Sequence, residues 1–142
     1  MTVYACCRTD VVTVTPEVSL QTVAILMEKE NVGSVVVVED EKPVGIVTDR
    51  DLALRAFVNR MDPETTHARE IMSHDPLVLE AGMGLFEAME FMRGRGVRRM
   101  PVVDEHGMLR GIITVDDIIR LLVEELSCIA NILEEESREA SL

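Results

Sequence analysis

Two seven-residue stretches, GIVTDRD at 45–51 and GIITVDD at 111–117, each set a threonine three positions before an aspartate. In both, two β-branched residues after the glycine predict the end of a buried strand, and the apolar residues after the aspartate predict a helix. Free N–H groups and the helix dipole make such a corner suited to an anion. The aspartate can accept hydrogen bonds from both hydroxyl groups of a ribose, and the threonine can donate to a phosphate. The pair therefore suits a nucleotide.

The same Thr-x-x-Asp pattern also predicts a capping box, in which the two side chains only satisfy backbone donors of their own helix. A single copy favours this structural interpretation. Two copies favour a ligand, because capping needs no glycine three residues upstream and tolerates other residue types at both positions. Both interpretations stay open at the level of the motif.

A second candidate feature is a basic island in an otherwise acidic chain, whose net charge is −12. It consists of Arg93, Arg95, Arg98 and Arg99. Guanidinium groups this close together repel one another unless they are solvated, paired with carboxylates or gathered around an anion. For Arg93 and Arg95, pairing with Glu87 or Glu90 is an equal alternative. Arg98 and Arg99 lead directly into an apolar run, which favours a bound anion for them.

The composition excludes several function classes. The negative charge argues against nucleic-acid binding, and no apolar run approaches the ~20 residues that a membrane span needs. Cys6, Cys7 and Cys128 fit reduced thiols in a cytoplasm better than a disulfide framework. The sequence has no Walker loop, HExxH or CxxC motif, and His67 and His74 look like solvated linker residues rather than a metal site. We therefore expect a cytoplasmic protein that is not an enzyme and has no metal, nucleic-acid or membrane partner.

The chain contains an internal repeat. A shift of 65 residues aligns Asp10 with Asp75 and Met27 with Met92, and one extra residue near 106–107 then aligns Thr48 with Thr114. Each unit predicts a short extended piece, a helix, a two-stranded hairpin and a second helix. The predicted strands are 12–14, 34–38 and 43–48, then 77–79, 100–103 and 109–114. Ser19 is the predicted N-cap of the first helix, and Gly33, Gly94 and Gly96 are predicted helix stops.

The predicted boundaries are 7–60 for the first domain, 61–70 for a polar linker, 71–124 for the second domain and 125–142 for a helical extension. The last helix continues an apolar stripe well past the repeat. The stripe consists of Ile118, Leu122, Leu126, Ile129 and Leu133. A stripe of this length needs a cover, which is either the same chain or a second copy in a homodimer.

A β-α-β-β-α unit that ends in Gly-x-x-Thr-x-x-Asp and occurs twice resembles a tandem pair of cystathionine-β-synthase (CBS) domains, a Bateman module. The resemblance covers residues 7–124. Its most specific parts are Val32–Val37 with GIVTDRD, Ile71–Met72, and Gly96–Val103 with GIITVDD. It implies an α+β (mixed α/β) fold, in which two pseudo-symmetric repeats pack together and carry a C-terminal helical extension.

The resemblance also implies a regulatory or sensing module that binds an adenosine-containing ligand between its two domains. The ligands of the family are commonly AMP, ADP or ATP, and sometimes NAD or S-adenosylmethionine. Magnesium would enter only as a nucleotide complex. By position, Asp51 and Asp117 would hold the ribose, Thr48 and Thr114 the ribose or phosphate, and Arg98 and Arg99 the phosphate. Adenine contacts would involve Val12, Val32, Gly33, Ser34 and Ile46 in one half, and Leu77, Val97 and Ile112 in the other.

The two halves differ in charge, since Gly33 and Ser34 stand where the second half has Arg98 and Arg99, and Arg50 lies inside the first motif. This difference predicts one tight site and one weak or empty one. The chain has no room for an effector, so we expect a free-standing sensor, or a fragment, that signals to an enzyme or transporter on another chain. The alternative is a ligand-free dimerisation or interaction module.

Overall fold

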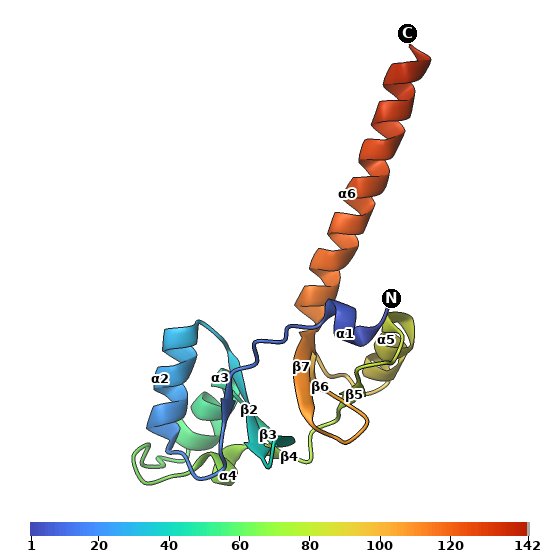
Figure 1. Ribbon diagram of the computed structural model, residues 1–142. Coiled ribbons are helices and arrows are strands. Elements are labelled where there is room, and N and C mark those ends of the chain that lie inside the picture. The colour runs from blue at the N-terminus through green and yellow to red at the C-terminus, as the bar shows by residue number, and fades with distance from the viewer. Residues whose placement is uncertain (142) are drawn as a thin grey trace.

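The computed structural model describes residues 1–141. These residues form two similar halves, and one long helix projects from the second (Figure 1). The first half contains β1 (Thr13–Val14), α2 (Leu20–Glu30), β2 (Ser34–Glu39), β3 (Lys42–Thr48), α3 (Asp49–Asp51) and the π-helical turn η1 (Leu52–Phe57). The second half contains β5 (Leu79–Glu80), α5 (Leu85–Arg93), β6 (Arg99–Val103), β7 (Leu109–Thr114) and α6 (Val115–Ala140). The predicted α+β class with two repeats is confirmed.

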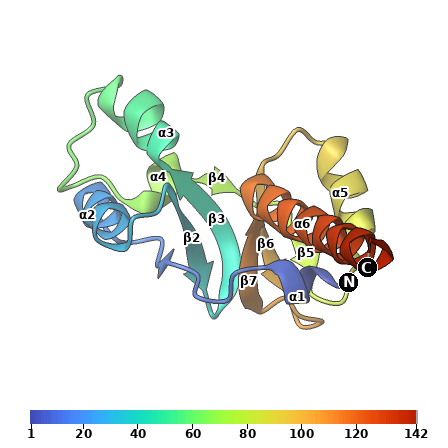
Figure 2. The same cartoon turned by 90° about the horizontal axis from the view of Figure 1, so that it is seen from above.

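Within residues 1–141, the first sheet has four strands (β1-β2-β3-β4, with β4 at Ser73–His74) and the second has three (β5-β6-β7), and the first three strands have the same topology in both. In each, a short first strand pairs parallel with the second strand, which forms an antiparallel hairpin with the third. The two sheets lie side by side, with β3 and β7 toward each other (Figure 2). The first hairpin contacts the second sheet directly, because Leu109 N–H donates to the Glu41 carbonyl at 2.8 Å.

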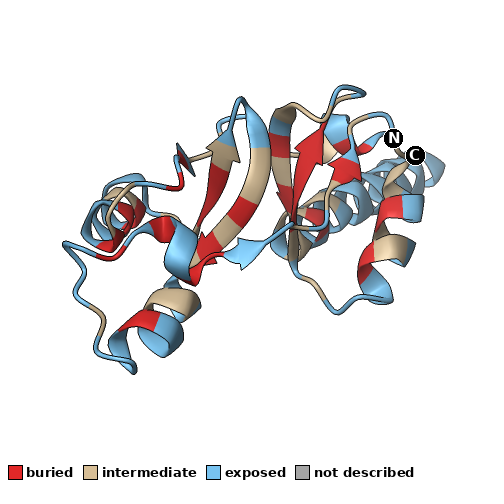
Figure 3. Cartoon of the chain, turned by 90° about the horizontal axis from the view of Figure 1, so that it is seen from below, coloured by how far each residue is buried: buried red, intermediate tan, exposed pale blue. Residues whose placement is uncertain are grey.

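Each half has its own hydrophobic core. Helix α2 contributes Leu20, Val23 and Met27, and α5 contributes Ala88 and Met92, in each case against the strands of the same half. Residues spaced three and four apart share one helix face, so the helices present an apolar side to their sheets. Burying an aliphatic side chain of this size stabilises the fold by about 1.5–3 kcal/mol. Figure 3 shows the buried residues on the inner faces of strands and helices.

Two short helices cross between the halves. Helix α1 (Val3–Cys6) precedes the first sheet, yet Val3 is fully buried in the second core. Arg8 then exchanges two backbone hydrogen bonds of 2.9 Å with Ile112 of β7. In the same way, α4 (Ala68–Ile71) packs into the first core, and β4 (Ser73–His74) pairs with β3. Each half is therefore completed by the segment that leads into the other half.

The predicted linker, residues 61–70, thus includes the start of α4, which is packed rather than extended. Ala68 and Ile71 correspond to Val3 and Cys6 at the repeat offset of 65, so each unit begins with a short helix that the sequence analysis missed. Four residues are too few for a periodic pattern to emerge. The division into two domains, a linker and an extension stays a prediction.

The crossing segments explain the two motif glycines. A Cβ at position 45 would overlap the Met72 sulfur and lie 2.8 Å from its Cγ, and a Cβ at position 111 would lie 2.5 Å from Cys7 Sγ and 2.7 Å from the Arg8 carbonyl oxygen. Close packing therefore disfavours a side chain at both positions whether or not a ligand binds, most strictly at Gly111, where a backbone carbonyl stands in the way. The repeated glycine cannot by itself favour a ligand over capping.

We expect Gly45→Ala and Gly111→Ala each to lower the free energy of unfolding by about 1–3 kcal/mol, which is typical of overpacking in a well-packed site. Urea unfolding followed by circular dichroism measures the loss. The two sites differ in how far the neighbouring atoms can move. Met72 has a flexible side chain, whereas the Arg8 carbonyl is held in a backbone bridge.

Double variants separate these two cases. Gly45→Ala combined with Met72→Ala is expected to be more stable than the sum of the single effects, because the new methyl group fills part of the vacated space. Gly111→Ala combined with Cys7→Ala is expected to show a much smaller recovery, because the Arg8 carbonyl remains. Equal recovery in both pairs would contradict this explanation.

The predicted N-cap Ser19 and the predicted helix stop Gly94 are confirmed, but the predicted stop at Gly33 is wrong. Ser19 caps α2 by accepting a 3.2 Å hydrogen bond from Thr22 N–H, and Gly94 caps the end of α5. Helix α2, however, ends at Glu30, and its C-cap is Asn31, which takes the left-handed conformation with φ 52°. Asparagine tolerates this conformation because its short amide can bond locally. Gly33 lies beyond the end, with Asp49 N–H donating to its carbonyl at 3.0 Å.

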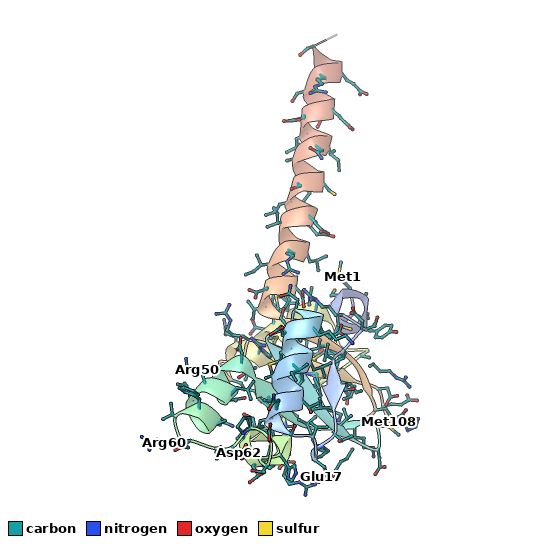
Figure 4. The ribbon with its side chains drawn as sticks, turned by 90° about the vertical axis from the view of Figure 1, so that its left-hand side faces the viewer. Met1, Glu17, Arg50, Arg60, Asp62 and Met108 are labelled. Atoms are coloured by element: carbon teal, nitrogen blue, oxygen red, sulfur yellow. The ribbon has the colours of Figure 1, made fainter. Side chains whose placement is uncertain are left out.

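Helix α6 leaves the second half after its first turns. Ile118 is buried in the second core, but every residue from Leu122 to Ser141 is exposed. Figure 4 shows the side chains of this part standing clear of both halves. In the described residues, 1–141, the stripe beyond Ile118 is therefore left uncovered. No helix within residues 1–141 combines the length and the hydropathy that crossing a membrane requires.

Candidate functional site

A cleft of about 600 Å³ lies between the two halves. On the first half it is lined by the segment before β1 and by the residues between α2 and β2; on the second half, by the start of β6, the end of β7 and the first turns of α6. Eight predicted site residues line it: Val12, Val32, Gly33, Ser34, Arg98, Arg99, Ile112 and Thr114. These residues come from both halves, whereas the adenine contacts were predicted as two separate groups, one in each half.

Strand register brings these side chains to one place. Thr114 ends β7 opposite Arg99, which begins β6, and Ser34 takes the matching position at the start of β2. Val36 N–H donates to the Val12 carbonyl at 3.0 Å and so holds the segment before β1 against β2. Val115 N–H donates to the Arg98 carbonyl at 2.8 Å, which fixes the residue before β6 over the helix start. Backbone hydrogen bonds thus set the positions of the residues that line the cleft.

Both Thr-x-x-Asp corners form the capping boxes that the pattern predicts. Thr48 Oγ1 accepts from Asp51 N–H at 3.1 Å, and Asp51 Oδ2 accepts from Thr48 N–H at 2.9 Å. Thr114 and Asp117 make the same two bonds at 3.1 and 3.2 Å. Each aspartate is thereby held in place by its own helix start. A capping carboxylate still has a second oxygen, so capping and ligand binding are compatible.

The two aspartates differ at that second oxygen. Asp117 Oδ1 lies 3.0 Å from both Nε and Nη2 of Arg8 and 3.3 Å from Nη1 of Arg120. Within residues 1–141, the one cationic group within 4.0 Å of Asp51 Oδ1 is Arg55 Nε, at 3.5 Å. The Asp117 carboxylate is therefore heavily occupied, while Asp51 keeps acceptor capacity.

The arginines of the basic island separate into two groups. Arg93 lies 3.5 Å from Glu90 and so follows the alternative of pairing with a carboxylate, whereas Arg95 stacks on the Phe91 ring instead of pairing with Glu87 or Glu90. Arg98 and Arg99 line the cleft. Arg98 pairs loosely with Asp116 at 3.6 Å. Within residues 1–141, no carboxylate oxygen lies within 4.0 Å of the Arg99 guanidinium, which leaves its charge free for an anion.

Several predicted residues lie outside the cleft: Ile46, Thr48, Arg50, Asp51, Leu77, Val97 and Asp117. Arg50, labelled in Figure 4, is exposed on α3. Val97 lines a separate groove beside α5 and α6. Asp117 does not line the cleft itself, but it forms ion pairs with Arg8 and Arg120, which do.

Three further charged residues that the sequence motifs did not predict, Arg8, Asp10 and Arg120, also line the cleft. A signal was present only for Arg120, one helical turn after Asp117, where a residue at i+3 shares its face. Arg8 enters because its segment crosses to β7, and no local pattern indicates such a crossing.

Other chemistry has little support in the described part of the chain. Burial raises the pKa of the Cys6 and Cys7 thiols, which keeps them protonated and weakly nucleophilic at neutral pH. No group of three or more His, Cys, Asp or Glu side chains within residues 1–141 is arranged to hold a metal ion. The cleft is therefore the candidate site.

Comparison with known sequences shows what the chain is similar to. The sequence profile described as CBS domain matches residues 3–56 and 68–124. An uncharacterised protein of Methanopyrus kandleri, MK0525, is 38% identical over 115 residues. That match covers 80% of this chain and 59% of the relative, so the chain spans less than two thirds of the length of that relative.

Solved structures have the same architecture. A protein with CBS domains from Burkholderia ambifaria superposes with a TM-score of 0.78 at 26% identity, covering 87% of this chain and 95% of the other. The CBS domain pair of protein MJ0100, in complex with 5′-methylthioadenosine and S-adenosylmethionine, gives a TM-score of 0.77 at 24% identity, covering 88% and 98%. The second likeness shows the fold alone.

Proposed function

The chain belongs to the CBS domain family, as a tandem pair of these domains, and from this premise we propose that its cleft binds an adenosine-containing ligand and acts as a sensor. The observation that carries the proposal is Arg99, a guanidinium without a carboxylate partner in residues 1–141, at the edge of a cleft in a protein of net charge −12. A free cation in this position has an anion as its natural partner. AMP, ADP and ATP are the first candidates, before NAD and S-adenosylmethionine.

The cleft offers a partner for each part of a nucleotide. Its volume of about 600 Å³ falls in the range of about 300–1,000 Å³ that is typical of small-molecule sites. Val12, Val32 and Ile112 would enclose the base between aliphatic side chains. Thr114 and Asp117 would contact the ribose, and Arg98 and Arg99 the phosphate. Family membership supports this ligand class, since another CBS domain pair, that of protein MJ0100, is in complex with two adenosyl compounds.

The remaining predicted residues belong to a second, weaker site. Ile46, Thr48, Arg50, Asp51, Leu77 and Val97 lie outside the cleft, and the first half has no counterpart of the paired arginines at 98 and 99. Because phosphate affinity follows positive charge, the cleft beside Thr114 would be the tight site. Magnesium would arrive only with a nucleotide. A cytoplasmic location and a regulated enzyme or transporter on another chain complete the proposal.

Isothermal calorimetry tests the sensor role. Before titration, the purified protein is denatured and its supernatant analysed for nucleotide, so that a carried ligand is not mistaken for an inert site. We expect micromolar binding of at least one of AMP, ATP, NAD and S-adenosylmethionine, with about one tight site per chain. Two equal sites would contradict the proposed asymmetry. Absence of both heat and carried nucleotide would contradict the sensor role.

A specific observation favours a second role, self-association through α6. With Ile118 buried, the exposed stripe begins at Ile119 and continues through Leu122, Leu126, Ile129 and Leu133. These side chains are 46–67% exposed, and they alternate at spacings of three and four, the repeat of a coiled coil. If two copies of α6 pair in parallel along this stripe, Glu125 of one helix lies beside Ala130 of the other. No carboxylate then faces another carboxylate at this position. A second copy of this chain is therefore the partner that the stripe fits, as a homodimer.

A further inference from the structure

Arg8 has a place in the structure that neither the sequence motifs nor the proposed nucleotide contacts explain. Its backbone is fixed by two 2.9 Å hydrogen bonds to Ile112. Its side chain lines the cleft and is half exposed, yet it reaches Asp117, whose side chain is only 8% exposed. Arg8 therefore lines the cleft, and its guanidinium binds the Asp117 carboxylate that is proposed to hold the ribose.

The Asp117 carboxylate is saturated in this arrangement. Five donors lie within 3.3 Å of its oxygens: Arg8 Nε and Nη2, Arg120 Nη1, Thr114 N and Thr114 Oγ1. A carboxylate offers about four lone-pair positions. No acceptor position is left for the two hydroxyl groups of a ribose. A sugar can reach Asp117 only if one of these donors leaves.

Arg8 is the donor that can leave. The two Thr114 donors belong to the cap of α6, so losing them would unravel the helix start. Arg120 contributes one contact at 3.3 Å, whereas Arg8 contributes two at 3.0 Å and blocks the most. When Arg8 moves away, its guanidinium becomes available to another anion, because within residues 1–141 Asp117 is its only ion-pair partner within 4.0 Å.

The first half shows that the fold does not require this arrangement. Ser73 pairs with Ile46 as Arg8 pairs with Ile112, and it carries no charge. Asp51, the counterpart of Asp117, is 13% exposed and keeps its second oxygen nearly free. The arginine at position 8 is therefore a feature of the cleft and not a structural necessity of the repeat.

We propose that Arg8 is an internal competitor for the ribose acceptor, which a ligand displaces from Asp117 and whose charge is then taken up by the phosphate of that ligand. This inference rests on the proposed function and specifies its selectivity. A nucleotide replaces the lost ion pair with a phosphate–guanidinium contact. A nucleoside displaces Arg8 without offering it a partner, so the ion pair with Asp117 is lost and no charge-assisted hydrogen bond replaces it. The cleft thereby selects for a phosphorylated ligand.

The test compares AMP with adenosine on two proteins. Arg8→Ser installs the residue of the equivalent position 73, so the substitution suits the backbone. Calorimetry on the wild type is expected to show AMP binding at least about tenfold more tightly than adenosine. In the Arg8→Ser variant, adenosine binding is expected to tighten and AMP binding to weaken, so that the ratio falls by about 10- to 100-fold. Opposite shifts for the two ligands are the signature of competition.

Arg110→Ser is the matched control. Arg110 is also an exposed arginine held by a carboxylate, Asp104 at 2.8 Å, but it lies outside the cleft. We expect it to leave both affinities unchanged. Thermal unfolding of both variants checks that the fold is retained.

The outcomes separate this inference from the proposed function. If AMP binds the wild type but Arg8→Ser weakens AMP alone, Arg8 is an ordinary phosphate contact and the competition is refuted. A parallel loss of both ligands, or no change in either, also refutes it. If neither the wild type nor the variant binds AMP, adenosine or the other adenosyl ligands, the proposed function itself fails. If only the variant binds adenosine, the competition is supported.

Discussion

Replacing Arg99 with glutamine is expected to weaken AMP binding by about 10- to 100-fold, because a charge-assisted hydrogen bond contributes about 1.5–3 kcal/mol. Arg99 begins β6 opposite Thr114, so its position depends on backbone pairing that glutamine leaves intact. With no carboxylate within 4.0 Å of it in residues 1–141, its loss leaves no buried acid unpaired. Calorimetric titration with AMP measures the change.

Arg93→Gln is the matched control for this prediction. Arg93 belongs to the same basic island, lies outside the cleft and pairs with Glu90. Both substitutions remove one positive charge, so any general effect of net charge appears in both. Equal weakening by the two variants would show that long-range charge, and not a contact in the cleft, attracts the ligand.

Replacing Leu126 and Ile129 with glutamate is expected to convert a dimer into a monomer. Both residues lie on the exposed stripe of α6, and two carboxylates per helix would face their copies across the seam. Since these positions are already exposed within the chain, the unfolding midpoint of the two halves should change little. Size-exclusion chromatography with light scattering measures the mass, and urea unfolding measures the stability.

The control double variant is Ser127→Glu with Asn131→Glu. It adds the same two charges to the same helix, but at positions outside the stripe, and both residues are exposed. We expect it to stay dimeric. A wild-type protein that remains monomeric at high micromolar concentration would refute pairing through α6, and dissociation of the control would attribute the effect to charge alone.

The two roles meet at one residue. Asp117 caps α6 and also holds Arg8, so the helix that carries the dimer stripe begins at the cleft. Release of Arg8 by a ligand would leave the Thr114 bonds of the cap in place. Sensing and assembly can therefore be tested separately, with the Arg8 and Leu126 variants respectively.

Much of the fold follows from local sequence signals. The apolar spacing after Ser19 predicts α2 because residues three and four apart share a helix face. The β-branched runs around Gly45 and Gly111 predict β3 and β7, and the two Thr-x-x-Asp corners predict the helix starts that follow them. The same local pattern recurs after 65 residues, and this repetition predicts two units of the same architecture.

Other features depended on contacts between segments far apart in the chain. The crossing of residues 3–8 to the second half brings Arg8 onto Asp117, 109 residues away, and it also explains Gly111 through Cys7. The sequence determined which residues can bind a sugar or a phosphate, because that depends on side-chain type. Only the tertiary structure decided which of them face one cleft and which acceptor is already occupied, because packing between the halves sets those distances.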